Sequence, residues 1–256
     1  VQPLIFDSVK QKENLERFYT QFIANDFLYK LGAEIIFDCA LRSRGEVNDL
    51  LLFGYFGQSI ENLWNLGSNV RHGFISLLPT TSFQCSEEDV FPFTVSNFDL
   101  ACSNLSLHFV NHVPLAFSNY KKILRKDGLF IATMVGDYSL FELREAFAYA
   151  DEKLYGGLFS RIMPMIKAES LVNLANRSGF RGVVIHTETV KLQYSSLIDM
   201  LRDLRQIGFS NFLASPVTAI SKNFLKIVSE YYWQNYSSND RLNLSFNIIT
   251  LSAVAQ

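Results

Sequence analysis

The feature that most constrains the fold of this chain is a set of short apolar runs that alternate with helical stretches. The clearest runs are residues 49–54, 98–103 and 129–135, and a glycine closes the first of them. Runs that are apolar throughout are typical of parallel strands, because helices then cover both faces of the sheet. The pattern therefore predicts an α/β fold.

Weaker runs and helical periodicities fill the rest of the chain. Further strands are expected at 73–78, 82–85, 183–190 and 246–253, a turn at 126–128, and helices at 14–27, 26–41, 60–66, 113–124, 139–153, 168–178, 196–207 and 220–233. The interpretation is a single domain over residues 1–256. It has an N-terminal helical cap at 1–46, a helical insertion after the fifth strand, and helical cover regions at 138–181 and 194–236.

Charge and composition exclude several classes of protein. Lys and Arg total 23 and Asp and Glu total 25, a balance that gives no basic surface for a nucleic acid. The longest run without these four residue types, 100–120, contains asparagine, histidine and proline, so no membrane span is expected. Cys39, Cys85 and Cys102 are widely spaced and no secretory signal is visible, which favours reduced thiols and a cytoplasmic location.

Three strings around the fourth expected strand carry a resemblance to a known family. They are FDL at 98–100, SNLSLHFVN at 103–111 and LRKDG at 124–128. With them the chain resembles class I S-adenosylmethionine-dependent methyltransferases, and more narrowly the BioC-like group and the mitochondrial complex I assembly factor 5 group. The resemblance runs from about residue 6 to about residue 251. It implies a three-layer, Rossmann-like fold whose mostly parallel seven-stranded sheet has the order 3-2-1-4-5-7-6, with strand 7 antiparallel.

The same resemblance implies S-adenosylmethionine as the cofactor, bound beyond the carboxyl ends of the strands. It places cofactor contacts in the turns after the first, third and fourth strands, at Gly54, Gly57, Glu87, Glu88, Asp89, Ser103 and Leu105. Each position has a plainer interpretation. The glycines serve any strand-to-helix turn, and the three acids suit a solvated turn.

Two parts of the family pattern are altered in this chain. Bulky Tyr55 and Phe56 stand in the turn that is normally rich in glycine, and the leading aspartate of that turn is replaced by leucine or has moved to Asp49. No carboxylate for the ribose hydroxyls occurs in residues 71–76. The loss of such an acceptor costs about 1–3 kcal/mol, or about tenfold to a few hundredfold in affinity.

The candidate catalytic residues are His108 and Arg144. His108 either orients or deprotonates a substrate, because imidazole titrates near neutral pH, or is a hydrogen-bonded structural residue. Arg144, together with Arg202 and Arg205, either receives a carboxylate or an acyl-carrier phosphate or forms surface salt bridges. No third ligand accompanies His108 and His112, so no metal site is expected.

These observations leave two functions open. The first is methyl transfer to a carboxylate or another small nucleophile. For the BioC-like group the resemblance implies a malonyl thioester on acyl carrier protein. The second is an atypical or non-catalytic assembly factor for respiratory complex I that retains the methyltransferase fold. The partner is accordingly a small-molecule or acyl-carrier-bound substrate, or a complex I subunit.

Overall fold

A computed structural model describes residues 4–17, 19–42, 47–57, 60–74, 83–89, 91–93, 97–214 and 219–256. The chain forms two compact units. We call them the helical unit, Val1–Asn25, Asp137–Met165 and Thr189–Asn247, and the sheet unit, Asp26–Gly136, Ile166–Glu188 and Ile248–Gln256. That residues 1–256 make a single domain stays a prediction.

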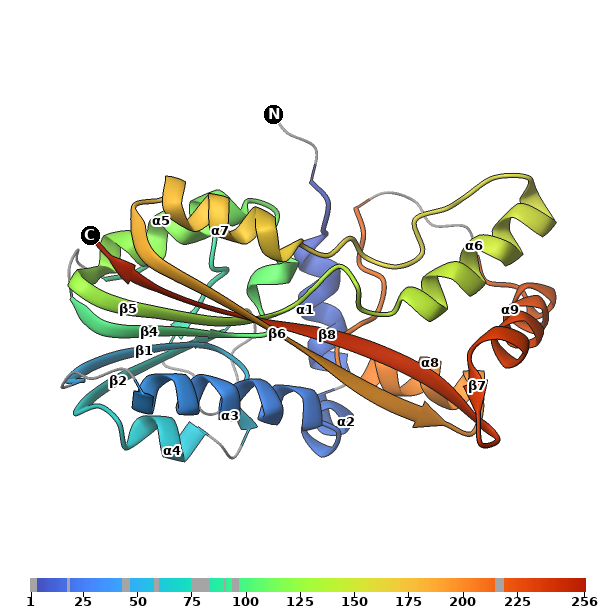
Figure 1. Ribbon diagram of the computed structural model, residues 1–256, viewed down its shortest axis with the longest axis horizontal. Coiled ribbons are helices and arrows are strands. Elements are labelled where there is room, and N and C mark those ends of the chain that lie inside the picture. Colours follow the sequence, from blue (N-terminus) through green and yellow to red (C-terminus); the bar gives the residue numbers. More distant parts are fainter. Residues whose placement is uncertain are drawn as a thin grey trace. The chain divides into compact units, whose positions relative to one another are not determined.

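The strands of the sheet follow the expected order. In the described residues the path is β3-β2-β1-β4-β5-β8-β6, and the short β7 pairs with β8 off this path (Figure 1). The bounds are β1 Asp49–Gly54, β2 Asn69–Phe74, β3 Phe83–Gln84, β4 Phe98–Asn104, β5 Leu124–Val135, β6 Phe180–Tyr194, β7 Ser237–Ser238 and β8 Arg241–Ala255. The pairs β3–β2, β2–β1, β1–β4 and β4–β5 are parallel, and β5–β8 is antiparallel. The predicted fold class and the antiparallel last strand are confirmed.

Helices cover both faces of this sheet, as the apolar strands require. On one face lie α3, Phe27–Arg42, and α4, Ile60–Trp64, and on the other lie α5, Val113–Ile123, and α7, Ala168–Arg177 (Figure 1). Each face has its own core: Ile36 and Leu63 pack on Leu52 in one, while Phe117 and Leu171 pack with Phe130 in the other. The result is the expected three-layer arrangement.

Three local expectations were wrong. β2 begins at Asn69 rather than at Gly73. Its first residues are polar and pair in parallel with the beginning of β1, and a search for apolar runs in the sequence does not detect such a strand. Residues 75–78 of the expected strand lie outside the described residues. The expected turn at 126–128 lies inside β5, where Asp127 has φ +65° and the pairing with β4 shifts register. The expected helix 14–27 is divided into α1, Ser8–Arg17, and α2, Tyr19–Ala24.

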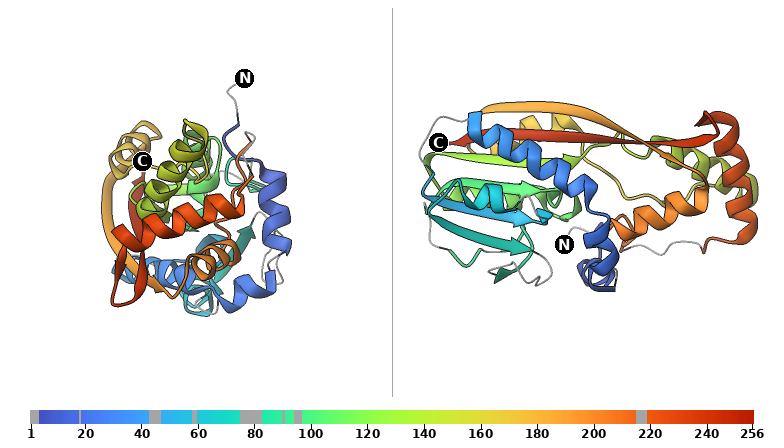
Figure 2. Two further views of the ribbon diagram at one scale, coloured as in Figure 1. Left: turned by 90° about the vertical axis from the view of Figure 1, so that its right-hand side faces the viewer. Right: turned by 90° about the horizontal axis from the view of Figure 1, so that it is seen from below.

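The helical unit also contains α6, Phe141–Tyr155, α8, Leu197–Gln206, and α9, Lys222–Asn235. α6 and α9 pack against each other, with Phe147 and Phe224 ring centroids 5.5 Å apart, and Figure 2 shows these helices side by side in yellow-green and orange-red. Serines begin two of the helices: Ser196 Oγ accepts from the Asp199 N–H and Ser221 Oγ accepts from the Phe224 N–H, both at 3.1 Å. None of the described helices is long and apolar enough to cross a membrane.

Candidate functional site

The candidate site is the sheet edge at which β1, β2, β4 and β5 end. These strands are parallel, so their carboxyl ends meet at one edge. The chain leaves β1 towards β2 on one side and leaves β4 towards β5 on the other, which makes β1/β4 the topological switch point. Gly54, Gly57, Ser103 and Leu105 all lie at or just beyond these strand ends.

The two glycines of the turn after β1 are needed by the packing of the protein itself. Gly54 has φ +104°, and a Cβ atom placed on it would lie 2.4 Å from the backbone oxygen of Asn104. Gly57 has φ +57°, and its Cβ would lie 2.6 Å from Asp26 Oδ2. A larger residue at either position would strain the backbone and collide with neighbouring atoms. Both positions therefore have a structural reason for glycine that does not involve a ligand.

The aromatic rings of Tyr55 and Phe56 lie in the protein interior. Tyr55 is 8% exposed, and its hydroxyl donates to Asp26 Oδ2 at 3.3 Å. Phe56 is fully buried in the core beneath α3 and α4, and its ring meets the His72 ring edge-on at 5.8 Å. His72 Nε2 in turn lies 2.6 Å from the Gly54 carbonyl oxygen. The turn after β1 is therefore held by contacts with buried side chains of the same chain.

Asn104, the last residue of β4, holds this edge together. Its Nδ2 donates to the carbonyl oxygens of Tyr29 at 2.8 Å and Tyr55 at 2.6 Å, and its Oδ1 accepts from Thr133 Oγ1 at 2.8 Å. The amide thereby links α3, the β1 turn, β4 and β5. Its role was missed in the sequence, where the only signal is an amide that ends an otherwise apolar strand.

Glu87 is the buried acid of the site. Its Oε1 accepts from Ser103 Oγ at 2.6 Å and from the Tyr120 hydroxyl at 2.5 Å. Its Oε2 is buried and has no hydrogen-bond partner among the residues that the structure describes. Burial raises the pKa of Glu87 to about 7, although the side chains of Ser103, Tyr120 and Ser106 act in the opposite direction. The structure thus joins two predicted site residues, Glu87 and Ser103, directly.

Glu88 and Asp89 bind backbone groups instead. Glu88 Oε2 accepts from the His112 N–H at 2.6 Å, and Asp89 Oδ2 accepts from the Ser86 N–H at 2.7 Å. These bonds fix the turn after β3 against the start of α5. Asp49, the other position considered for the leading aspartate, begins β1 and therefore lies at the opposite edge, where Oδ2 pairs with Arg125 Nη2 at 2.6 Å.

His108 lies in the 3-10 turn Leu107–Phe109 after β4, close to the predicted contact Leu105, which has φ +46°. The imidazole is 5% exposed, and its ring centroid is 3.9 Å from that of Phe109. Burial lowers the pKa of His108 to about 3. The ring is therefore neutral at pH 7 and a weak base, so it orients a neighbour better than it removes a proton.

The three candidate arginines belong to the helical unit. Arg144 Nη1 donates to the Asp137 carbonyl oxygen at 3.1 Å, and Arg202 Nη1 pairs with Asp199 Oδ1 at 2.8 Å. Arg205 is exposed and forms no ion pair with a described residue. For Arg202 the structure thus shows the salt bridge that was the plainer interpretation.

The buried acid and the buried imidazole predict opposite pH effects on stability. Between about pH 4.5 and 7 folded Glu87 keeps a proton that the unfolded chain has released, so this group makes the unfolding free energy fall as the pH rises. Below pH 6.5 the unfolded chain binds a proton that folded His108 does not bind until about pH 3, so this group makes the unfolding free energy fall as the pH falls.

Urea unfolding across this pH range separates the two effects. The difference in unfolding free energy between wild type and Glu87→Gln should decrease by about 1–3 kcal/mol from pH 4.5 to 7.5. The difference between wild type and His108→Gln should increase as the pH rises from 4 to 6.5. Curves that stay parallel to the wild type in both variants would show that neither group has a shifted pKa in the folded state.

S-adenosylmethionine, the cofactor implied by the resemblance, fits this edge only at its adenine end. Glu87 Oε2 is buried and has no hydrogen-bond partner among the described residues, and when the carboxylate is ionised it is an acceptor suited to the exocyclic amine of an adenine. The β1 turn departs from the family's glycine-rich pattern, because Tyr55 and Phe56 stand between its two glycines. Over residues 71–74 β2 offers no carboxylate for a ribose, and positions 75 and 76 lie outside the described residues.

Comparisons with known proteins agree with this architecture. A family profile described as a methyltransferase domain matches residues 60–132. Human mitochondrial arginine-hydroxylase NDUFAF5 is 31% identical over 163 residues, which cover 64% of this chain and 47% of that protein. The malonyl-[acyl-carrier protein] O-methyltransferase of Gallionella capsiferriformans is 27% identical over 130 residues, which cover 51% of this chain and 43% of that protein. The chain spans about half the length of these relatives.

A solved structure shares the fold. The YcgJ protein of Bacillus subtilis superposes with a TM-score of 0.59 at 11% identity, over 88% of this chain and 98% of that one. S-adenosylmethionine is the cofactor that defines the superfamily to which these matches point. By its sheet order, its string at 103–111 and its relatives, the chain has the fold and the sequence motifs of class I S-adenosylmethionine-dependent methyltransferases and is similar to NDUFAF5 and to the BioC-like enzymes.

Proposed function

We propose that this protein binds S-adenosylmethionine weakly at the carboxyl edge of its sheet and methylates a carboxylate or another small nucleophile. The observation that carries the proposal is Glu87, a buried acid with a spare acceptor oxygen that is bonded to the end of β4 at the switch point. The likeness to a malonyl-[acyl-carrier protein] O-methyltransferase supports a carboxylate, free or carried on acyl carrier protein, as the acceptor.

The residues of the edge are suited to positioning rather than to proton transfer. Bound S-adenosylmethionine would supply a methyl group on a sulfonium. Glu87 would hold its adenine, while the Asn104 network keeps the edge rigid. An ionised carboxylate is already a nucleophile, so the reaction needs no general base and the low basicity of His108 does not prevent it. The imidazole would orient the acceptor and help to exclude water.

Calorimetry with S-adenosylhomocysteine tests the cofactor site. We expect measurable heat at millimolar ligand, because only the adenine end of the site fits the ligand. Phe74→Asp, which places a carboxylate at the end of β2, should tighten binding about tenfold or more. Asn69→Asp, at the other end of the same strand, is the matched control and should leave affinity unchanged. If neither wild type nor Phe74→Asp gives any heat, the cofactor proposal is wrong.

A second candidate function is an assembly factor for respiratory complex I that uses the fold without ordinary methyl transfer. The altered β1 turn favours it, since Tyr55 and Phe56 stand in a turn that this family usually keeps rich in glycine, and both rings pack into the interior of the chain. A pull-down from the source cells discriminates between the two. Recovery of acyl carrier protein supports the methyltransferase, and recovery of a complex I subunit supports the assembly factor.

The cysteines bear on where the protein works. Cys39, Cys85 and Cys102 form no disulfide bond in the structure. Free thiols persist in reducing compartments. A cytoplasmic location is therefore part of the proposal, and thiol titration of the protein isolated under alkylating conditions would test it by showing three free thiols.

A further inference from the structure

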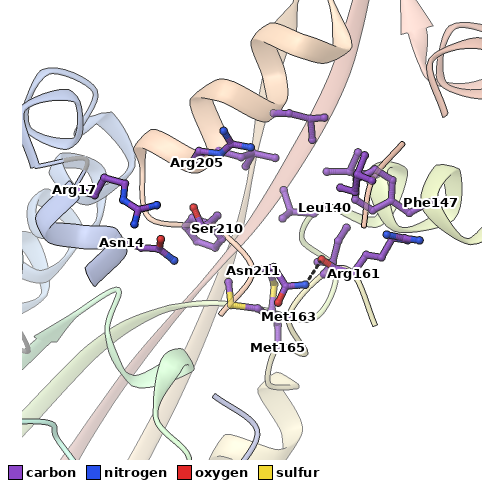
Figure 3. Close-up of a pocket in the computed structure, with 16 residues that line it drawn as sticks. Asn14, Arg17, Leu140, Phe147, Arg161, Met163, Met165, Arg205, Ser210 and Asn211 are labelled. Atoms are coloured by element: carbon purple, nitrogen blue, oxygen red, sulfur yellow. Dashed lines mark hydrogen bonds between the residues drawn. The ribbon is translucent and has the colours of Figure 1, made fainter. Parts of the chain in front are cut away.

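We propose that the helical unit contains a binding site for an aliphatic chain that ends in an anionic head, either a carboxylate or a phosphate. The site is a cavity of about 360 Å³ lined by α1, α6, α8 and residues near 163 and 210 (Figure 3). Cavities that hold small ligands begin at about 300 Å³. The lining residues all belong to the helical unit, so the inference goes beyond the proposed function and does not depend on the cofactor site.

One end of the cavity carries positive charge that no described acidic residue neutralises. Arg17, at the end of α1, and Arg205, on α8, both line the cavity, and neither forms an ion pair with a described residue. The third arginine of the lining, Arg161, is bound to Asp151 at 2.7 Å. Since no acidic residue is found among the described lining residues, an anionic head would meet two guanidinium groups that no described carboxylate pairs with.

Uncharged donors stand beside these arginines. Ser210 Oγ is buried and has no hydrogen-bond partner within the described parts of the chain. Figure 3 shows Ser210 and Asn14 on the same side of the cavity as Arg17 and Arg205. A buried hydroxyl without a partner is uncommon, and an oxygen of a bound head group would supply one.

Much of the remaining lining of the cavity is apolar. It consists of buried side chains from α6, α8 and the segment before α7, among them Leu140, Leu143, Phe147, Met163 and Leu204. A methionine adapts its shape to an alkyl chain. A hydrocarbon alone would leave the arginines unused, and an inorganic anion alone would leave the apolar wall unused. An amphiphilic anion uses both.

Calorimetry on the full chain, without cofactor, tests the site with three ten-carbon probes: decanoate, decyl phosphate and decan-1-ol. We expect at least one of the anions to bind at least tenfold more tightly than the alcohol, and the tighter anion identifies the head group. Each methylene removed from that anion should weaken binding about fourfold. If neither anion binds at millimolar concentration, or if the alcohol binds equally well, the proposal is overturned.

Variants of the two arginines locate the binding. Arg17→Gln and Arg205→Gln should each weaken binding of the tighter anion about tenfold. Arg202→Gln is the matched control, because Arg202 lies on the same helix as Arg205, pairs with Asp199 and does not line the cavity. Unchanged affinity in both cavity variants would contradict the site. Thermal unfolding of each variant shows that it is folded, and the result is independent of S-adenosylhomocysteine binding.

Discussion

Replacement of Asp151 by asparagine should lower the unfolding free energy by about 3–5 kcal/mol, a large part of the stability of a typical domain. Asp151 on α6 and Arg161 form an ion pair whose side chains are 1% and 2% exposed. Both Arg161 Nε and Nη2 donate to the carboxylate, and the guanidinium also lies over the Phe224 ring at 4.2 Å. The variant removes the charge of Asp151 while the guanidinium stays buried, and loss of one partner is the costly outcome for a buried pair.

Thermal unfolding measures this effect, at about 2–4 °C for each kcal/mol in a chain of this size. The matched control is Asp127→Asn, which breaks an ion pair with Arg181 in which both side chains are more than half exposed. We expect a loss of less than about 1 kcal/mol there. The double variant Asp151→Leu with Arg161→Met removes both charges and should be more stable than Asp151→Asn alone. Equal losses in the buried and exposed pairs would contradict the burial of Asp151.

Gly54→Ala should have the second large effect, a loss of about 2–4 kcal/mol. The position has φ +104°, where alanine is strained, and its Cβ would lie 2.4 Å from the Asn104 backbone oxygen. Because that oxygen belongs to β4 in the middle of the sheet, it cannot move without breaking the pairing of β1 with β4.

Gly157→Ala is the matched control for this substitution. A Cβ at Gly157 meets no heavy atom within 4 Å. The free energy of unfolding of Gly157→Ala, measured in urea, should therefore stay within about 0.5 kcal/mol of the wild-type value. If Gly54→Ala were as stable as Gly157→Ala, the β1 turn would have to adopt another conformation, and the account of the closed turn would be wrong.

The positions of the buried strands were predictable because their signals are local, whereas the order of the strands followed from the family resemblance. The run at 49–54 became β1 with the expected bounds, and the string at 103–111 identified the family before the sheet was known. β2 was harder to predict, because Asn69 and Arg71 are polar and gain their hydrogen bonds only from the neighbouring strand. The local hydrophobic pattern of the sequence therefore predicted the buried strands well and the partly polar strand β2 poorly.

The candidate site was predictable in position but not in chemistry. Glu87 and Ser103 were both expected at the sheet edge, yet nothing local indicated that they bind each other or that Glu87 is buried. His108 was expected to titrate near neutral pH, whereas burial keeps it neutral. Sequence spacing gives the element on which a side chain stands, while its pKa depends on the atoms that surround it after folding.

The sequence by itself determined the α/β class and the positions of the buried strands, because apolar runs and glycine punctuation are properties of neighbouring residues. The order of the strands, and with it the edge at which their carboxyl ends meet, followed from the family resemblance of the strings at 98–100, 103–111 and 124–128. Only the tertiary structure decided that Tyr55 and Phe56 turn inward. It also decided that Asn104 hydrogen-bonds both to Tyr55 in the β1 turn and to Tyr29, which lies 75 positions before Asn104 in the sequence. The same holds for the two arginines of the helical unit, since Arg17 and Arg205 are far apart in the sequence and line the same cavity. Contacts of such long range depend on how the elements pack, which no local pattern encodes.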